Sequence, residues 1–112
     1  SLALLDLVKQ LCSQEELQSF RLVGGTALAL QIGHRISVDI DLFSNEVVDK
    51  LNIELALRKI GPKSNTYKTT HNVRADIKGV RVDLYDDWYI PFRNSPLIED
   101  AIRIASLEDI AA

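Results

Sequence analysis

The sequence lacks methionine and contains one cysteine, Cys12, which excludes a disulfide within the chain and suits a reducing compartment. It has no apolar run long enough to span a membrane and no segment that resembles a signal peptide. The formal net charge is -3, so no overall positive charge attracts nucleic acid, and a polyanionic partner requires a local basic patch. These absences favour a cytoplasmic protein that does not bind membranes.

The composition is that of a globular domain. The chain has 112 residues, of which 46% are hydrophobic and 26% are charged, and this length suits one compact core. We therefore expect a single domain over residues 1–112. The segment 106–109, Ser-Leu-Glu-Asp, has the pattern of a helix start, yet only three residues follow it. This pattern predicts that the natural protein continues past residue 112, with a frayed terminal turn as the alternative. The missing initiator methionine is typical of a processed or engineered piece.

Hydrophobic periodicity predicts both helices and strands. The expected order is a helix ending near Ser19, a strand over 20–23, a helix over 26–32, a strand over 36–42, a helix capped by Ser44 and ended by Gly61-Pro62, an edge strand over 65–70, a hairpin over 73–85 with Lys78-Gly79 as its turn, and a short strand over 101–105. The apolar stripe of the helix after Ser44 is expected to comprise Val47, Val48, Leu51 and Leu55, continued by Arg58.

Two aspartates share one face of the predicted strand over 36–42. Asp39 and Asp41 are two residues apart, so their side chains leave the strand on the same side, roughly 6 to 7 Å apart at the backbone. Both carboxylates can therefore reach one metal ion, and Mg²⁺ prefers hard oxygen ligands. The alternative is a solvated strand face. Against it, aspartate is depleted in strands, and two like charges repel unless a cation lies between them.

A glycine turn precedes this strand. Gly24, Gly25 and Thr26 lie between a predicted strand and a predicted helix, where backbone N–H groups can approach and bind phosphate. The segment matches neither the P-loop nor the dinucleotide fingerprint, so a turn with a purely steric role is the alternative. Arg35 follows the predicted helix and has a permanent charge suited to nucleotide phosphates, although a solvated loop arginine is the alternative.

A third aspartate lies in the predicted hairpin. Asp83 shares a face with Arg81. If its strand lies beside the Asp39–Asp41 strand, the three carboxylates can form one cluster. Otherwise, Asp83 pairs with Arg81 across solvent. The following Asp86 and Asp87 are expected to be turn residues.

The stretch from Leu22 to Phe43 resembles the signature of the AbiEii/AbiGii toxin family, a branch of the polymerase-β-like nucleotidyltransferases. The motifs that carry the resemblance, in their order along the chain, are Gly24-Gly25-Thr26, Gly33-His34-Arg35 and Ser37-Val38-Asp39-Ile40-Asp41-Leu42-Phe43. Weaker similarity continues through the hairpin to residue 112. The resemblance implies an α/β (α+β) fold in which a mixed β-sheet is flanked by helices.

The resemblance also implies an activity. The enzyme would transfer a nucleoside monophosphate from an NTP to an acceptor hydroxyl, with pyrophosphate leaving. The Gly24–Thr26 turn would hold the NTP phosphates, Asp39 and Asp41 would bind Mg²⁺, and Asp83 would be a third carboxylate at the metal and acceptor. A cognate antitoxin is the implied protein partner. RNA, particularly tRNA ends, is the implied acceptor, and protein hydroxyls are its main rival.

Family members continue into a helical region with a lysine and a further aspartate, and this chain stops before them. Two other functions therefore stay open. One is a catalytically silent module on the same fold that binds nucleotide or protein. The other is a metal-dependent phosphohydrolase, because a pair of aspartates also suits that chemistry.

Overall fold

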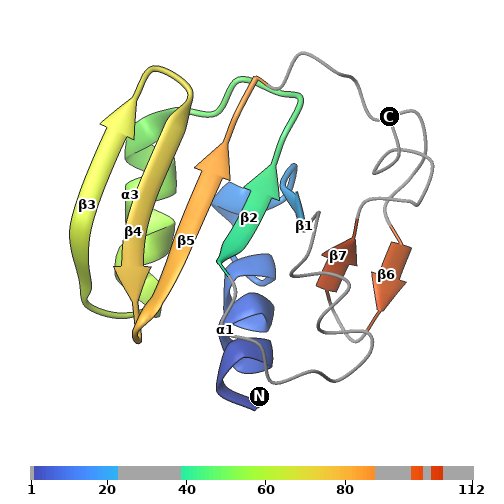
Figure 1. The fold of residues 1–112 in the computed structure, drawn as a ribbon. Helices are drawn as coiled ribbons and strands as arrows, with labels where there is room; N and C mark the ends of the chain where they lie inside the picture. The colour runs from blue at the N-terminus through green and yellow to red at the C-terminus, as the bar shows by residue number, and fades with distance from the viewer. Residues whose placement is uncertain (1, 23–38, 88–96, 100–101, 105–112) are drawn as a thin grey trace.

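The computed structural model describes residues 2–22, 39–87, 97–99 and 102–104 (Figure 1). Several predicted features lie outside these residues, namely the Gly24–Thr26 turn, the helix over 26–32, Arg35 and the first part of the strand over 36–42. Their structures stay predictions. Among the described helices, none has the length and apolar character needed to cross a membrane.

The described strands form one mixed seven-stranded sheet in the order β3-β4-β5-β2-β1-β7-β6. The strands are β1 (Arg21–Leu22), β2 (Ile40–Phe43), β3 (Lys63–Thr69), β4 (Asn72–Ile77), β5 (Val80–Tyr85), β6 (Leu97–Glu99) and β7 (Ile102–Ile104). β2 is parallel to β5 and antiparallel to β1, while β1 is parallel to β7. The mixed sheet expected from the resemblance is confirmed.

Helices α1 (Leu2–Cys12) and α3 (Lys50–Ile60) lie on the same side of this sheet (Figure 1). Alternate residues of the central strands β2, β4 and β5 pack beneath them because successive side chains of a strand point to opposite faces. The strand residues in this core, all at most 1% exposed, are Ile40, Leu42, Val73, Ala75, Ile77, Val82 and Leu84. The residues between them face the other way, so the central strands have one apolar face and one polar face.

The first helix is shorter than predicted. α1 ends at Cys12, and a short 3-10 helix, η1 (Glu15–Leu17), follows in place of the expected continuation to Ser19. The Ser13 hydroxyl donates to the Gln10 carbonyl at 2.7 Å, a local bond that competes with continued helix. The turn also brings Leu17 and Phe20 into the core, where they are at most 1% exposed.

The prediction for the start of the second described helix is wrong. α3 begins at Lys50, and its N-cap is Asp49, whose Oδ1 accepts from the Leu51 N–H at 2.8 Å. Ser44 is instead fully buried, and its hydroxyl accepts from the Glu46 N–H at 3.1 Å within the preceding loop. The loop therefore takes up the residues that were expected to form the first turns of the helix.

The predicted apolar stripe of this helix is also wrong. α3 buries Ile53, Ala56 and Leu57, whereas Leu51 is 67% exposed and Leu55 is 46% exposed. Helical spacing was extended from Val47 and Val48, but these residues lie in the loop. Packing against the sheet and η1 therefore decides which side of the helix is buried.

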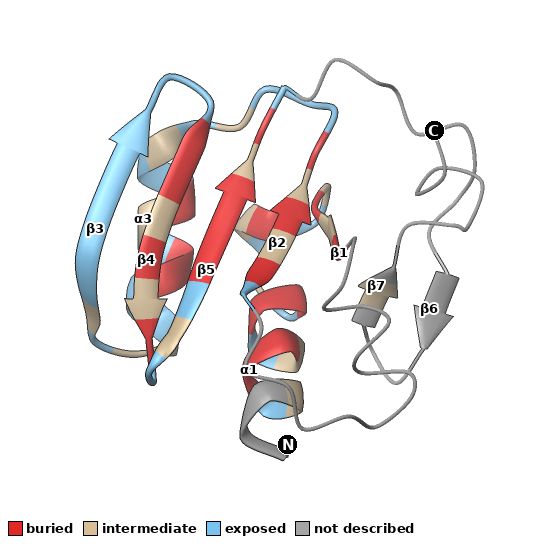
Figure 2. Ribbon diagram, viewed as in Figure 1, coloured by how far each residue is buried: buried red, intermediate tan, exposed pale blue. Residues whose placement is uncertain are grey.

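The hairpin is confirmed. β4 and β5 are antiparallel and joined by Lys78-Gly79, with positive φ at both turn residues (52° and 79°), as a tight two-residue turn requires. β3 is confirmed as a strand at the edge of the sheet, although it begins at Lys63. It is exposed along almost its whole length (Figure 2). β7 lies within the short strand expected over residues 101–105.

Candidate functional site

Asp41 and Asp83 lie side by side on the polar face of the sheet. Asp41 belongs to β2 and Asp83 to β5, and the parallel register of these strands makes the two residues direct neighbours. Adjacent strands are about 4.8 Å apart. Asp41 is flanked on β2 by Ile40 and Leu42, whose side chains are buried in the core. Figure 2 shows this alternation of burial along the strand. The structure thus brings together two of the three predicted carboxylates.

Asp39 immediately precedes β2 and is exposed, so it lies just outside the strand in which it was predicted. It nevertheless acts on Asp41. Burial raises the pKa of the Asp41 carboxyl, the negative charges of Asp83 and Asp39 raise it further, and Arg74 partly offsets them. The three aspartates are therefore electrostatically coupled. A cation at Asp41 would relieve the repulsion from Asp83 and Asp39, which adds to the effect of burial on this pKa.

The expected pairing of Asp83 with Arg81 is wrong. Asp83 is only 3% exposed, and its Oδ1 accepts from Arg74 Nε at 2.8 Å. Arg81 is exposed and lies opposite Asp76. The sequence contained the missing signal, because a two-residue turn at residues 78–79 places Ile77 opposite Val80. Counting back from that pair places Arg74 opposite Asp83.

Asn72 is a second partner of Asp83 that sequence reasoning missed. Its Nδ2 donates to Asp83 Oδ1 at 3.3 Å and to the Leu84 carbonyl at 3.2 Å. Asn72 is 8% exposed, and its ladder partner in β5 is Tyr85. The carboxylate thus has one guanidinium donor and one amide donor on the same oxygen.

Aromatic rings border the carboxylates on the same face. Phe43 and Tyr85 are neighbours on β2 and β5, and their rings stack with centroids 4.8 Å apart and an interplanar angle of 12°. Burial and the charges of Asp83 and Asp41 raise the pKa of the Tyr85 hydroxyl, against the effect of a hydrogen bond with Arg74. The Arg74 guanidinium also lies 5.8 Å from the centroid of the Tyr67 ring. These rings were not recognised in the sequence.

The donor set at this position fits a hard divalent cation. Asp41 and Asp83 offer carboxylate oxygens, the ligands that Mg²⁺ prefers, and their mutual repulsion favours a bound positive charge. Within residues 39–87 and the other described segments, no group of three or more His, Cys, Asp or Glu side chains is arranged to hold a metal. The described residues therefore supply two candidate ligands, Asp41 and Asp83. The negative charge of Asp39 adds to the attraction that they offer a cation.

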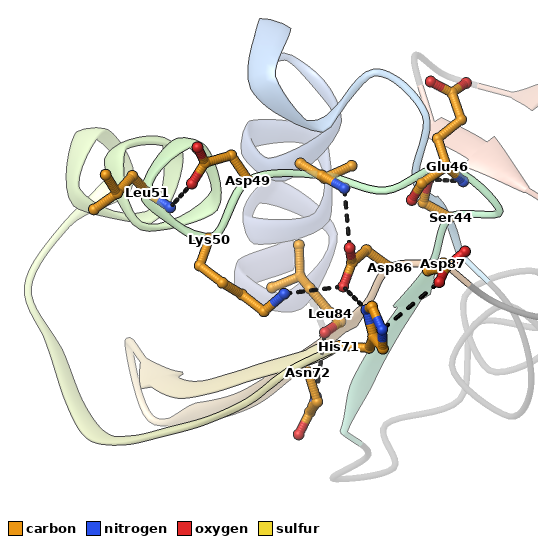
Figure 3. A network of polar contacts seen from close by, with 11 residues as sticks. Ser44, Glu46, Asp49, Lys50, Leu51, His71, Asn72, Leu84, Asp86 and Asp87 are labelled. Atoms are coloured by element: carbon orange, nitrogen blue, oxygen red, sulfur yellow. Dashed lines mark hydrogen bonds and ion pairs between the residues drawn. The ribbon is translucent and has the colours of Figure 1, made fainter.

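A second polar cluster surrounds Asp86, which was predicted to be a turn residue (Figure 3). Asp86 is only 2% exposed. Its carboxylate accepts from the Val48 N–H at 2.9 Å and from Lys50 Nζ at 3.2 Å, and His71 Nδ1 lies 3.4 Å away. Burial by itself raises the pKa of Asp86, but these donors outweigh it and the net direction is down. Asp86 is therefore an anchor that ties the end of β5 to the loop before α3.

Comparison with family models gave a match over nearly the whole chain. The model described as "Nucleotidyl transferase AbiEii toxin, Type IV TA system" matches residues 6–112. Comparisons with curated proteins and with solved structures found no match. The matched range includes the Gly24–Thr26 segment, the Asp39–Asp41 segment and Asp83.

Proposed function

The chain belongs to the AbiEii nucleotidyltransferase toxin family of type IV toxin–antitoxin systems, and from this premise we propose that it forms a Mg²⁺-dependent site that transfers a nucleoside monophosphate from an NTP to an acceptor hydroxyl. The observation that carries this proposal is the pairing of Asp41 with Asp83 on adjacent parallel strands, where their charges act on each other. The proposed unit is one nucleotidyltransferase core domain over residues 1–112, acting in the cytoplasm.

Asp41, Asp83 and Asp39 are the proposed ligands of the metal. When bound, Mg²⁺ would neutralise charge on the triphosphate and favour departure of pyrophosphate. Support comes from the pKa of Asp41, which burial and the negative charges of Asp83 and Asp39 raise, because a bound cation would stabilise the charged carboxylate against both effects. Asp83 is proposed to position the acceptor hydroxyl, or to take its proton, from the β5 side of the pair.

The strand order supports a proposal in which the two substrates bind on opposite sides of the acid pair. β1 ends at Leu22, whose ladder partner is Leu42, the residue after Asp41. Gly24–Thr26 follow Leu22 closely in the chain, so we propose that the phosphates bind on the β1 side and that Arg35 contacts the same phosphates. Asp83 lies on β5, on the other side of β2. An acceptor would therefore approach from the side of β5 and β4.

The proposed acceptor is RNA, particularly a tRNA end, with a protein hydroxyl as the rival. A cognate antitoxin is the partner that membership of a toxin–antitoxin family implies. The deciding experiment incubates the full-length protein with each α-³²P-labelled NTP, Mg²⁺ and total RNA, and follows transfer of label to RNA. A parallel reaction with total protein tests the rival acceptor. Retention of all label in NTP in both reactions would contradict the proposal.

The variant Asp39→Ala/Asp41→Ala is the control for that assay, because it removes the proposed ligands and should abolish labelling without unfolding the domain.

A specific observation favours a second candidate, a catalytically silent nucleotide-binding module. Asp83 already has an arginine partner, and among the described residues no three His, Cys, Asp or Glu side chains are arranged to hold a metal. Thermal stabilisation by NTP and Mg²⁺ with no labelled product would support this candidate.

A further inference from the structure

Two residues of β4 hold Asp83 in a defined orientation. We propose that Asn72 and Arg74 form a clamp, acting as positioning residues that fix one oxygen of Asp83 and leave the other for the metal and the acceptor. This inference rests on the proposed function. It assigns a role in the reaction to β4, a strand that carries none of the predicted catalytic residues.

Both donors of the clamp bind the same atom. Arg74 Nε lies 2.8 Å from Asp83 Oδ1, and Asn72 Nδ2 lies 3.3 Å from that oxygen. No hydrogen bond or ion pair from a described residue is made to Asp83 Oδ2. The χ2 torsion of aspartate is broad, so a free carboxylate samples many orientations. Two donors on one oxygen narrow this range and keep the second oxygen available to a ligand.

The clamp is itself held in place. The amide nitrogen of Asn72 also donates to the Leu84 carbonyl at 3.2 Å, so two contacts of one buried amide group define its orientation. Arg74 has a hydrogen bond with the Tyr85 hydroxyl as well, and its guanidinium lies over the Tyr67 ring. Because Asn72 and Arg74 are two residues apart on β4, both project onto the face that carries the acids.

The position of Arg74 is better suited to orienting a carboxylate than to binding phosphate as a free cation. Its Nε is already bonded to Asp83, and its side chain is 37% exposed. Its positive charge opposes a nearby metal ion, so an effect of charge alone would weaken metal binding. If only the charge of Arg74 mattered, its removal would strengthen metal binding. If Arg74 orients the Asp83 carboxylate, its removal would weaken metal binding. This difference in sign makes the clamp testable.

The test uses the full-length protein and Mn²⁺ as the probe metal. Mn²⁺ binding is measured by electron paramagnetic resonance, and nucleotide transfer is measured with Mg²⁺ and labelled NTP. The variants are Arg74→Lys, which keeps the charge but loses the Nε donor, Arg74→Gln, and Asn72→Leu. Arg81→Gln is the matched control. It also removes one arginine charge, from the face of β5 that carries Asp83, but Arg81 has no hydrogen bond to Asp83.

We expect Arg74→Lys, Arg74→Gln and Asn72→Leu each to raise the Mn²⁺ dissociation constant about 10-fold or more, the size usual for partners that orient a metal ligand. The saturating transfer rate should fall by a similar factor with little change in the KM for NTP. Arg81→Gln should change neither quantity by more than about two-fold. Arg74 is more than a third exposed, so its variants should fold, and they decide the test if Asn72→Leu unfolds in circular dichroism.

Wild-type metal affinity in Arg74→Lys, or tighter Mn²⁺ binding in Arg74→Gln, would overturn the clamp while the proposed function stands. If the wild-type protein neither binds Mn²⁺ nor transfers label, the proposed function fails and the clamp fails with it.

Discussion

The two faces of the central strands carry different properties of this protein. On one face, apolar residues such as Leu42, Val82 and Leu84 are at most 1% exposed and pack beneath the helices. On the other face, burial and the negative charges of Asp83 and Asp39 raise the pKa of Asp41. Residues adjacent in sequence therefore differ in effect, since one set stabilises the fold and the other forms the proposed site at some cost in stability. Substitutions that separate these effects test the comparison.

The largest expected effect is on activity. Asp41→Asn should reduce labelled product by about 10³-fold or more, because an amide removes the negative charge that holds the metal opposite the transferring phosphate. Initial rates with labelled NTP and Mg²⁺ measure this loss. Asp76→Asn is the control. Asp76 lies on β4, on the same polar face of the sheet as Asp41, and its carboxylate accepts a hydrogen bond from the Asn65 side chain. An equal loss of activity in both variants would contradict a specific role of Asp41 in binding the metal.

The same division should appear across α3. Leu57→Ala should lower the free energy of unfolding by about 2 to 5 kcal/mol, because it leaves a cavity at a fully buried position. Leu51→Ala should change it by no more than about 0.5 kcal/mol, because that side chain is 67% exposed. Urea unfolding followed by circular dichroism measures both values. A large loss in Leu51→Ala would show that this side of α3 is covered in the whole protein.

A smaller effect is expected at Asp86. Asp86→Asn should lower the free energy of unfolding by about 1 to 3 kcal/mol, because charge-assisted contacts with Lys50 and the Val48 N–H are weakened at a buried site. The pKa of Asp86 is lowered on folding, so its stabilisation is complete above the ordinary value of 3.8 and is lost as pH falls through the folded value.

Urea unfolding between pH 7 and pH 2 follows that loss. The wild-type protein should lose more stability on acidification than Asp86→Asn, because the amide does not titrate. Asp87→Asn is the control, since the Asp87 side chain is 49% exposed. Equal pH dependence in wild type and Asp86→Asn would contradict the anchor role of Asp86.

The smallest effect has the opposite sign. Asp41→Asn should raise the free energy of unfolding at neutral pH and without metal by about 0.5 to 1 kcal/mol, because it removes repulsion at the site. The pKa of Asp41 is raised on folding, so the wild-type protein gains this stability as pH falls through the folded value toward the ordinary value of 3.8. Thermal unfolding with and without Mg²⁺ measures both effects. Mg²⁺ should stabilise the wild type more than the variant, and destabilisation by Asp41→Asn would contradict the proposed repulsion.

Patterns of nearby residues predicted much of this fold. The turn at Lys78-Gly79 determines the register of β4 with β5, so the contact between Arg74 and Asp83 was available from the sequence although we did not recognise it. The alternation of β2 likewise predicted that Asp41 projects away from the core. Both features follow from the sequence because covalent geometry and a short turn are sufficient to specify them.

Helix boundaries and faces were predicted less well. The sequence pattern around Ser44 is typical of a helix N-cap, and we predicted that the helix begins there. In the structure Ser44 is buried in a loop, and α3 begins at Lys50. The helix then buried Leu57 and left Leu51 exposed. Local propensities differ by only fractions of a kcal/mol per residue, so packing of a whole helix against the sheet outweighs them.

The sequence by itself determined the alternation of the strands, the hairpin and the resemblance to the family. Only the tertiary structure decided that β2 and β5 are parallel neighbours and that Asp41 lies beside Asp83. It also decided which donors reach Asp83. The physical reason is that parallel pairing of strands so far apart in the chain depends on the long-range packing of the sheet and helices, which no local pattern of residues encodes.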